Sequence, residues 1–252
     1  MNFLNPRKVK RAVKLFLFNS KAFSKLMRRN HLLVIGDSHV NVFKYLKQSH
    51  LLPKSVWIDY LTVGGATAQG VLNPGSKTDA RRLFLERVNS AKKFQHLLVQ
   101  LGEVDCGFVI WYYSEKLGSS VDAQLFRSSE NYSTFLKELK SLGFNTVSVL
   151  SAPLPTIRDG QDWGDIAKKR SEVTAKQTDR TELTVRFNRE MLAVCASQGI
   201  NYIDHTSIML NESTGIVRDE YLHHDKNDHH LNDETYAELI ANSLETMFGK
   251  NR

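Results

Sequence analysis

The feature that most constrains the fold of this chain is a regular alternation of short apolar runs with amphipathic helical segments. Five runs are typical of strands, at residues 31–36, 55–63, 96–104, 145–153 and 200–205. A helical pattern follows each of them, at about 39–49, 78–93, 124–142, 181–198 and 233–247. Runs that are apolar almost throughout are expected for parallel strands that helices cover on both faces. The pattern therefore predicts an α/β fold in which five strand–helix units form one parallel sheet.

Length and composition favour a single soluble domain in a reducing compartment. The chain has 252 residues, of which 41% are hydrophobic and 24% are charged, as is usual for a globular protein. Its two cysteines, Cys106 and Cys195, lack the spacing of a metal site. They are most simply free thiols, which favours the cytoplasm, and a disulfide between them is the alternative. We expect the α/β domain to occupy residues 31–252.

The positive charge of the chain is concentrated in an N-terminal segment, residues 1–30. This segment holds nine Lys and Arg and no Asp or Glu, whereas the rest of the chain has 25 basic and 27 acidic residues. Its apolar runs are too short for a signal peptide or for the roughly 20 residues of a membrane-spanning helix. If the segment is helical, five apolar residues lie near one side: Val9, Val13, Phe16, Leu17 and Phe23.

That pattern favours peripheral contact with an anionic membrane surface. A helix packed on the domain and a disordered basic arm are the alternatives. Nucleic acid is not expected as a partner, because the rest of the chain supplies no basic stripe.

Four polar or glycine-rich stretches follow predicted strands, and ligands of open parallel sheets bind at such strand ends. In the first, GDSH (36–39), the Ser38 hydroxyl and backbone N–H lie where a helix begins. This placement suits a nucleophile that generates an oxyanion at an ester carbonyl, and a simple helix N-cap is the alternative. In the second, GGAT (64–67), paired glycines either expose N–H groups to a ligand or form a plain turn.

The third and fourth stretches supply acids and histidines. GEVD (102–105) places Glu103 and Asp105 at a strand end, although Asp105 could simply cap the next segment. The stretch 223–233, HHDKNDHHLND, has four histidines and three acids. A histidine held there by a carboxylate could act as general base towards Ser38. Two alternatives remain open, a divalent metal site and a solvated loop whose Asp233 caps the last helix.

Together and in this order, the four stretches resemble the SGNH/GDSL family of hydrolases. The closest agreement is in GDSH (36–39) and DHHLN (228–232), and the resemblance covers about residues 31–247. It implies a flavodoxin-like three-layer α/β/α sandwich with a five-stranded parallel sheet. It also implies that Ser38 is the nucleophile and one oxyanion donor, that Gly65 is a second donor and that His230 is the base.

The chain departs from the family pattern in its third block. The family usually has Gly-X-Asn-Asp there, with the Asn side chain donating to the oxyanion, and Val104 stands in place of that Asn. Loss of one such donor costs about 10²–10³ in rate. The resemblance leaves Asp37, Glu103 and Asp105 as supporting residues of the site.

A second departure affects the acid of the triad. The family commonly has Asp three residues before the His, where this chain has Asn227. We therefore assign Asp228 as the acid and hold Asp225 in reserve. If His229 rather than His230 were the base, that assignment would shift as well.

The resemblance implies a serine esterase that removes a small acyl group, such as acetyl, from a carbohydrate or similar polar ester, without a cofactor or metal. The substrate would be a small-molecule or polysaccharide ester. An O-acyltransferase with the same triad, a non-catalytic carbohydrate-binding module and a metal-dependent phosphoesterase are the alternatives. Residues 105–123 contain aromatic side chains that could stack on sugar rings, form a lid or belong to the core.

Overall fold

The computed structural model describes residues 30–91, 94–160 and 173–249, and it confirms the predicted parallel sheet. The five strands are β1 (Asn30–Gly36), β2 (Val56–Thr62), β3 (His96–Gln100), β4 (Thr146–Leu150) and β5 (Asn201–Ile203). They are all parallel and lie in the order β2-β1-β3-β4-β5. This order is flavodoxin-like, and it places β1 between β2 and β3.

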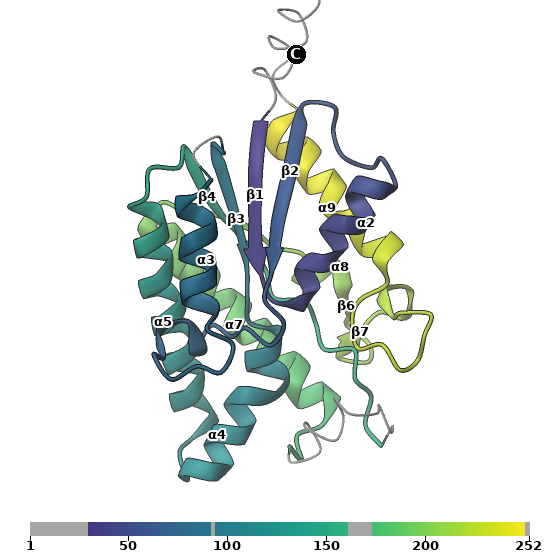
Figure 1. Cartoon of the computed structure of the whole chain (residues 1–252). Helices are drawn as coiled ribbons and strands as arrows, with labels where there is room; N and C mark the ends of the chain where they lie inside the picture. Colours follow the sequence, from purple (N-terminus) through teal and green to yellow (C-terminus); the bar gives the residue numbers. More distant parts are fainter. Residues whose placement is uncertain (1–29, 92–93, 161–172, 250–252) are drawn as a thin grey trace, which may run out of the picture.

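Helices cover both faces of the sheet and complete a three-layer α/β/α sandwich (Figure 1). One face packs against α3 (Ala80–Asn89), α5 (Val121–Lys140) and α7 (Gln177–Gln198). The other packs against α2 (Val42–Gln48), α8 (Thr206–Met209) and α9 (Asp233–Phe248). Alternate residues of β1 enter opposite cores, Leu33 and Ile35 one and Leu32 and Val34 the other. The apolar run of β1 is thus continuous because helices cover both faces of the sheet, as the sequence predicted.

The connection after β3 differs from the expected loop. The strand ends at Gln100, and Gly102 then takes a φ of 123°, which ends the extended run earlier than residue 104. A π-helical turn, η3 (Asp105–Val109), leads into α4 (Ile110–Leu117). The rings of Phe108 and Tyr112 stack with their centroids 5.5 Å apart, across one turn of this helical segment. The aromatic side chains therefore pack on one another along the segment.

Short elements complete the described chain. They are the 3₁₀ turns η1 (Ser38–Asn41), η2 (Gly70–Leu72) and η4 (Asp219–Tyr221), and the antiparallel pair β6 (Leu210–Asn211) and β7 (Ile216–Val217). Both cysteines are free and buried, as expected for thiols without a disulfide. Within the described ranges no helix is both long and apolar enough to cross a membrane.

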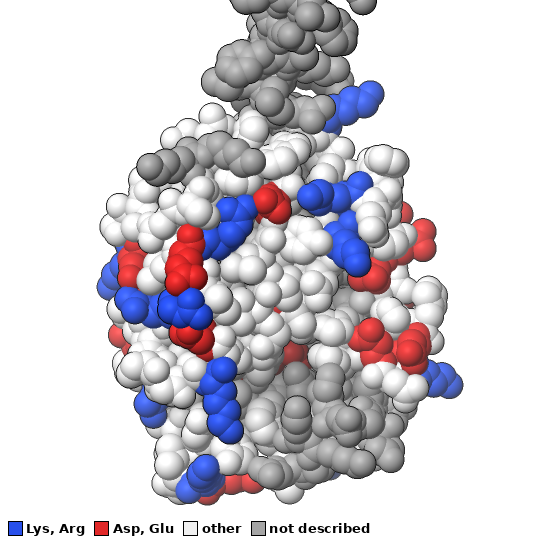
Figure 2. Space-filling view, in the orientation of Figure 1, with Lys and Arg blue, Asp and Glu red and all other residues white. Residues whose placement is uncertain are grey.

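Residues 1–29 lie outside the described residues, so the expectation for the basic segment stays a prediction. On the domain itself, Figure 2 shows Lys and Arg interspersed with Asp and Glu on the face it presents. The described residues of the domain also form ion pairs at the surface, among them Arg81 with Glu138 and Arg82 with Glu86.

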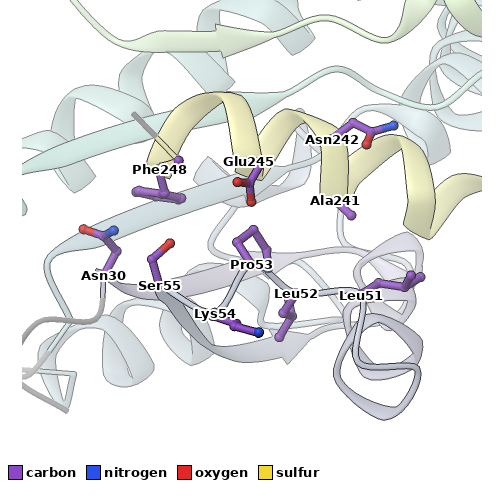
Figure 3. Close-up of a pocket in the computed structure, with 11 residues that line it drawn as sticks. Asn30, Leu51, Leu52, Pro53, Lys54, Ser55, Ala241, Asn242, Glu245 and Phe248 are labelled. Atoms are coloured by element: carbon purple, nitrogen blue, oxygen red, sulfur yellow. The ribbon is translucent and has the colours of Figure 1, made fainter. Parts of the chain in front are cut away.

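A cavity of about 540 Å³ lies at the amino end of the sheet (Figure 3). Asn30 at the start of β1, the loop 51–55 and the last turns of α9 line it. Glu245 is the acidic side chain in this lining, which otherwise contains apolar and neutral residues and Lys54. The four stretches singled out from the sequence lie at the opposite, carboxyl end of the strands.

Candidate active site

Ser38 lies directly beyond the carboxyl end of β1. A Cβ atom on Gly36 would come within 2.1 Å of the Gln100 carbonyl oxygen of β3, so only glycine fits where the chain leaves the sheet. The next residue, Asp37, caps η1, because its Oδ1 accepts a hydrogen bond from the His39 N–H at 2.9 Å. The suggestion that Ser38 is merely the N-cap is therefore wrong. Ser38 is the first residue of the turn and is partly exposed.

The glycine-rich stretch lies beside Ser38 because β2 is the neighbour of β1. The Val63 N–H donates to the Gly36 carbonyl at 2.9 Å, which extends the pairing into this loop. Gly65 is solvent exposed and has a φ of 72°, a backbone conformation that favours glycine. The exposed backbone of Gly65 thus lies at the same end of the sheet as Ser38.

Asp105 anchors this loop from the far side. Its two carboxylate oxygens accept the backbone N–H groups of Ala68 at 2.7 Å and Gln69 at 2.9 Å. The suggestion that Asp105 caps the following segment is wrong, since Val104 is the capping residue of η3 and makes no side-chain cap bond. Burial raises the pKa of Asp105 to about 6, although these two N–H bonds oppose the rise.

The third block is closely packed at its glycine. A Cβ on Gly102 would lie 2.4 Å from Phe187 Cε1, and the following Glu103 is 2% exposed. The Glu103 carboxylate lies 3.4 Å from the Nε2 atom of His39. Val104 is partly exposed and carries no donor in its side chain.

The fourth stretch forms the predicted histidine–carboxylate pair. The Nδ1 atom of His230 lies 2.6 Å from Asp228 Oδ1, which also accepts the His230 backbone N–H at 2.9 Å. The opposite ring atom of His230, Nε2, is buried and has no hydrogen-bond partner among the described residues. A histidine oriented in this way presents an unpaired nitrogen to whatever enters the site.

The alternative residues of this stretch take other positions. Asp225 accepts the backbone N–H of Asn227 and so shapes the turn. The His229 ring lies against that of His230 at 4.1 Å, and its carbonyl accepts the Thr156 hydroxyl. Asp233 does not cap the last helix, because Asn232 is the N-cap of α9 and accepts the Thr235 N–H.

A cavity of about 220 Å³ brings Ser38, Asp228 and His230 together. Its remaining lining residues come mainly from η1, α2 and the start of α9: His39, Asn41, Val42, His223, Leu231, Asp233 and Tyr236. Gly65, Glu103 and Asp105 are outside this lining. The catalytic assignments themselves stay predictions.

The electrostatics of the pair suit a neutral histidine beside an ionised acid. Burial opposes ionisation of Asp228, but the hydrogen bonds from the His230 backbone and ring outweigh it and lower the pKa of Asp228. Burial lowers the pKa of His230, and the nearby His39 lowers it further against the effect of Asp228. The His230 ring is therefore held in the form that can accept a proton.

Asp37 is buried completely, and burial raises its pKa to about 7 in spite of His39. His39 itself was not singled out from the sequence. The signal was present, because His39 follows Ser38 directly and Glu103 lies in the third block. Their contact joins two strand ends, which a linear pattern does not reveal.

Asp228, His229 and His230 are one group whose ligand atoms lie within 4.8 Å of one another. The contact of 2.6 Å between Asp228 and His230 is a hydrogen bond. It is shorter than the roughly 3.3 Å that separates two ligands of a tetrahedral zinc ion bound at about 2.0 Å. The donors as arranged fit a histidine–acid pair better than a metal centre.

Comparison with known proteins identifies the fold. No protein-family model and no curated protein matches the chain. Solved structures do match it, including a proposed acylhydrolase from Bacteroides fragilis, with 16% identity and a TM-score of 0.55 over 88% of this chain and 87% of that one. A GDSL-like lipase from Bacteroides thetaiotaomicron has 14% identity and a TM-score of 0.52, covering 86% of this chain and 89% of its own.

An acetylxylan esterase from Geobacillus stearothermophilus, solved as a catalytic mutant, has 13% identity and a TM-score of 0.51. The alignment covers 87% of this chain and 94% of that one. These matches extend over most of the chain, and they show that it has the SGNH hydrolase fold expected from the four stretches.

Proposed function

We propose that this chain is a serine esterase that removes a small acyl group from a polar ester through an acyl-enzyme on Ser38. The observation that carries the proposal is a cavity lined by Ser38 and by the His230–Asp228 pair, in which the Nε2 atom of His230 has no hydrogen-bond partner among the described residues. Nucleophile, base and orienting acid are the three parts that acyl transfer requires.

In the first half-reaction, His230 Nε2 takes the proton of the Ser38 hydroxyl as its oxygen attacks the ester carbonyl. Asp228 holds the Nδ1–H of the ring and stabilises the imidazolium that forms. The tetrahedral intermediate collapses, the C–O bond to the alcohol breaks, and His230 returns the proton to the leaving alcohol. In the second half-reaction water repeats the attack on the acyl-enzyme, and the carboxylic acid and Ser38 are regenerated.

The oxyanion would be bound by backbone N–H groups of Ser38 and Gly65. Preorganised donors of this kind need no reorganisation during the reaction. Asp105 supports the arrangement by fixing the segment that follows Gly65. Val104 contributes no donor, so we expect turnover to be about 10²–10³ slower than with an asparagine there.

Cavity size and an aromatic pair after the third block support a small acyl group and a carbohydrate. A cavity of about 220 Å³ with polar walls accommodates an acetyl-sized group better than a long acyl chain. Phe108 of η3 and Tyr112 of α4 follow the third block, and their rings stack on each other. Both side chains are partly exposed, aromatic faces suit the apolar faces of sugar rings, and one structural neighbour is an acetylxylan esterase.

The N-terminal segment extends the proposal. We propose that residues 1–30 hold the protein at an anionic membrane surface. The segment joins the domain at Asn30, at the amino end of β1, whereas Ser38 follows its carboxyl end about 20 Å away. A domain attached through that end would direct its cavity towards the aqueous phase, which favours a water-borne ester over a bilayer lipid. Equal pelleting of the full chain and of residues 31–252 with anionic liposomes would contradict this attachment.

The test of the esterase is labelling with a fluorophosphonate probe, followed by mass spectrometry of the adduct. We expect an adduct on Ser38 that is absent from Ser38→Ala, and hydrolysis of p-nitrophenyl acetate with the same dependence. Product analysis with an acceptor sugar then separates hydrolysis from O-acyl transfer, which needs the same residues.

Val104 is the observation that favours a second candidate, a non-catalytic carbohydrate-binding module. Absence of both labelling and hydrolysis, together with saturable binding of an acetylated oligosaccharide, would replace the esterase by that candidate.

A further inference from the structure

A second pair of titratable side chains lies behind the proposed triad. His39 and Glu103 are almost completely buried, with side-chain exposures of 2% and 3%, and their Nε2 and Oε2 atoms are 3.4 Å apart. They come from two neighbouring strand ends, His39 from η1 after β1 and Glu103 from the connection after β3. The mechanism above uses neither of them.

The pair contacts the proposed base directly. The His39 ring packs edge to face against the His230 ring, with centroids 5.0 Å apart and an interplanar angle of 62°. His229 lies against the same ring at 4.1 Å. The backbone of His39 is fixed in turn, because its N–H donates to Asp37. His230 is thus in contact with two imidazole rings, whose own centroids are 6.3 Å apart, while Asp228 holds its Nδ1 atom.

Buried charges are retained when they are paired, and a carboxylate close to an imidazole favours the imidazolium form. The charged or titratable groups that face His230 come from three segments. They are Asp228, His229 and His223 of its own loop, His39 from the end of β1, and Glu103 from the end of β3. Asp37 contacts His39 rather than His230, and Asp233 at the start of α9 lines the same cavity. Of the groups on other segments, His39 has the larger effect on the pKa of His230 and lowers it, whereas Glu103 raises it less.

We propose that His39 and Glu103 are a positioning pair for the base: they fix the His230 ring edge-on and keep a positive charge beside it. This inference rests on the proposed function and deepens it by assigning the device that sets the working pH range of the site. With a cation beside it, His230 stays neutral, and able to accept the Ser38 proton, at lower pH than the Asp228 contact alone would allow.

The test is a pH titration of the histidine ring signals by NMR, which needs no substrate, combined with the pH profile of kcat/KM for p-nitrophenyl acetate. In His39→Gln the amide can still donate to Glu103 but the charge is gone. We expect the titration of His230 and the acidic limb of the profile to move up together by about one pH unit. The double variant His39→Gln/Glu103→Gln should move both in the same direction by a smaller amount.

His205→Gln is the matched control. His205 is equally buried, its Nε2 atom contacts Ser243, and it lies outside the cavity lining, so its replacement should leave the titration of His230 in place. If His39→Gln fails to fold, the NMR spectrum of the wild-type protein tests the proposal instead. The proposal requires that His39 be an imidazolium at a pH where His230 is neutral.

A neutral His39 at that pH would refute the proposed role of the His39–Glu103 pair. So would a pKa of His230 that is unchanged in both variants. If the titration moves as expected but neither hydrolysis nor labelling occurs, the pair stands and the esterase fails. If hydrolysis depends on Ser38 and the titration does not move, the esterase stands and the pair fails.

Discussion

Replacement of Asp37 by asparagine should stabilise the protein, and the gain should grow with pH. Asp37 is 0% exposed, its Oδ1 accepts the His39 N–H, and its Oδ2 has no hydrogen-bond partner among the described residues. Burial raises the pKa of its carboxyl to about 7 from the usual 3.8. Asn retains the acceptor for His39 and removes the charge, so the substitution isolates the cost of ionisation.

The direction follows from linkage. A carboxyl whose pKa is raised on folding binds its proton more tightly in the folded state, so the stability it contributes is complete below pH 3.8. That contribution is lost as the pH rises through about 7, where the folded carboxyl ionises. Each pKa unit corresponds to about 1.4 kcal/mol, so the ionised Asp37 destabilises the fold by up to about 4 kcal/mol.

The assay is urea unfolding of the parent and Asp37→Asn between pH 4.5 and pH 8. We expect the difference in unfolding free energy to rise by about 2–4 kcal/mol across this window and to level off above pH 7. Asp225→Asn is the control, because Asp225 is exposed and also accepts a backbone N–H. A difference for Asp37→Asn that is constant or falls with pH would refute the argument from burial.

Three further predictions concern the site and its support. Asp228→Asn should lower kcat by about 10²–10⁴-fold while unfolding midpoints barely change, since the acid orients His230 from a partly exposed position. Val104→Asn should raise kcat by about 10²-fold if the new amide reaches the oxyanion, as steady-state kinetics with p-nitrophenyl acetate would show. Gly102→Ala should destabilise the fold by about 3 kcal/mol or more, because its Cβ would overlap Phe187, whereas Gly118→Ala meets no atom within 4 Å and should cost about 1 kcal/mol in thermal unfolding.

The sheet could be predicted from the sequence because the pattern of buried parallel strands is local. The four central residues of β1, from Leu32 to Ile35, are apolar regardless of which core they enter, so a continuous apolar run is sufficient evidence. Local patterns failed after β3, where Leu101 continues the apolar run but the positive φ of Gly102 turns the chain. They also failed in residues 105–123, where η3 and α4 form helical structure that the pattern did not predict.

The site shows the same division between local and distant contacts. Asp228 and His230 are two residues apart, so their hydrogen bond could be anticipated from spacing. The bonds from Asp105 to Ala68 and Gln69 join positions more than 30 residues apart in the chain, and no spacing rule specifies them. Sequence therefore suggested a capping role for Asp105 that the fold replaces with anchoring of the glycine-rich loop.

The three residues that follow Gly102 in the third block make different contacts. Asp105 fixes the loop that displays Gly65, and Glu103 pairs with His39 against the proposed base. Val104 lies between them without a side-chain donor, so in the proposed mechanism stabilisation of the oxyanion would depend on backbone N–H groups. A site with fewer donors depends more on the placement of its base, and in this chain both neighbours of Val104 serve placement. We therefore expect the rate of the proposed esterase to respond more to the geometry around His230 than to any single side-chain donor.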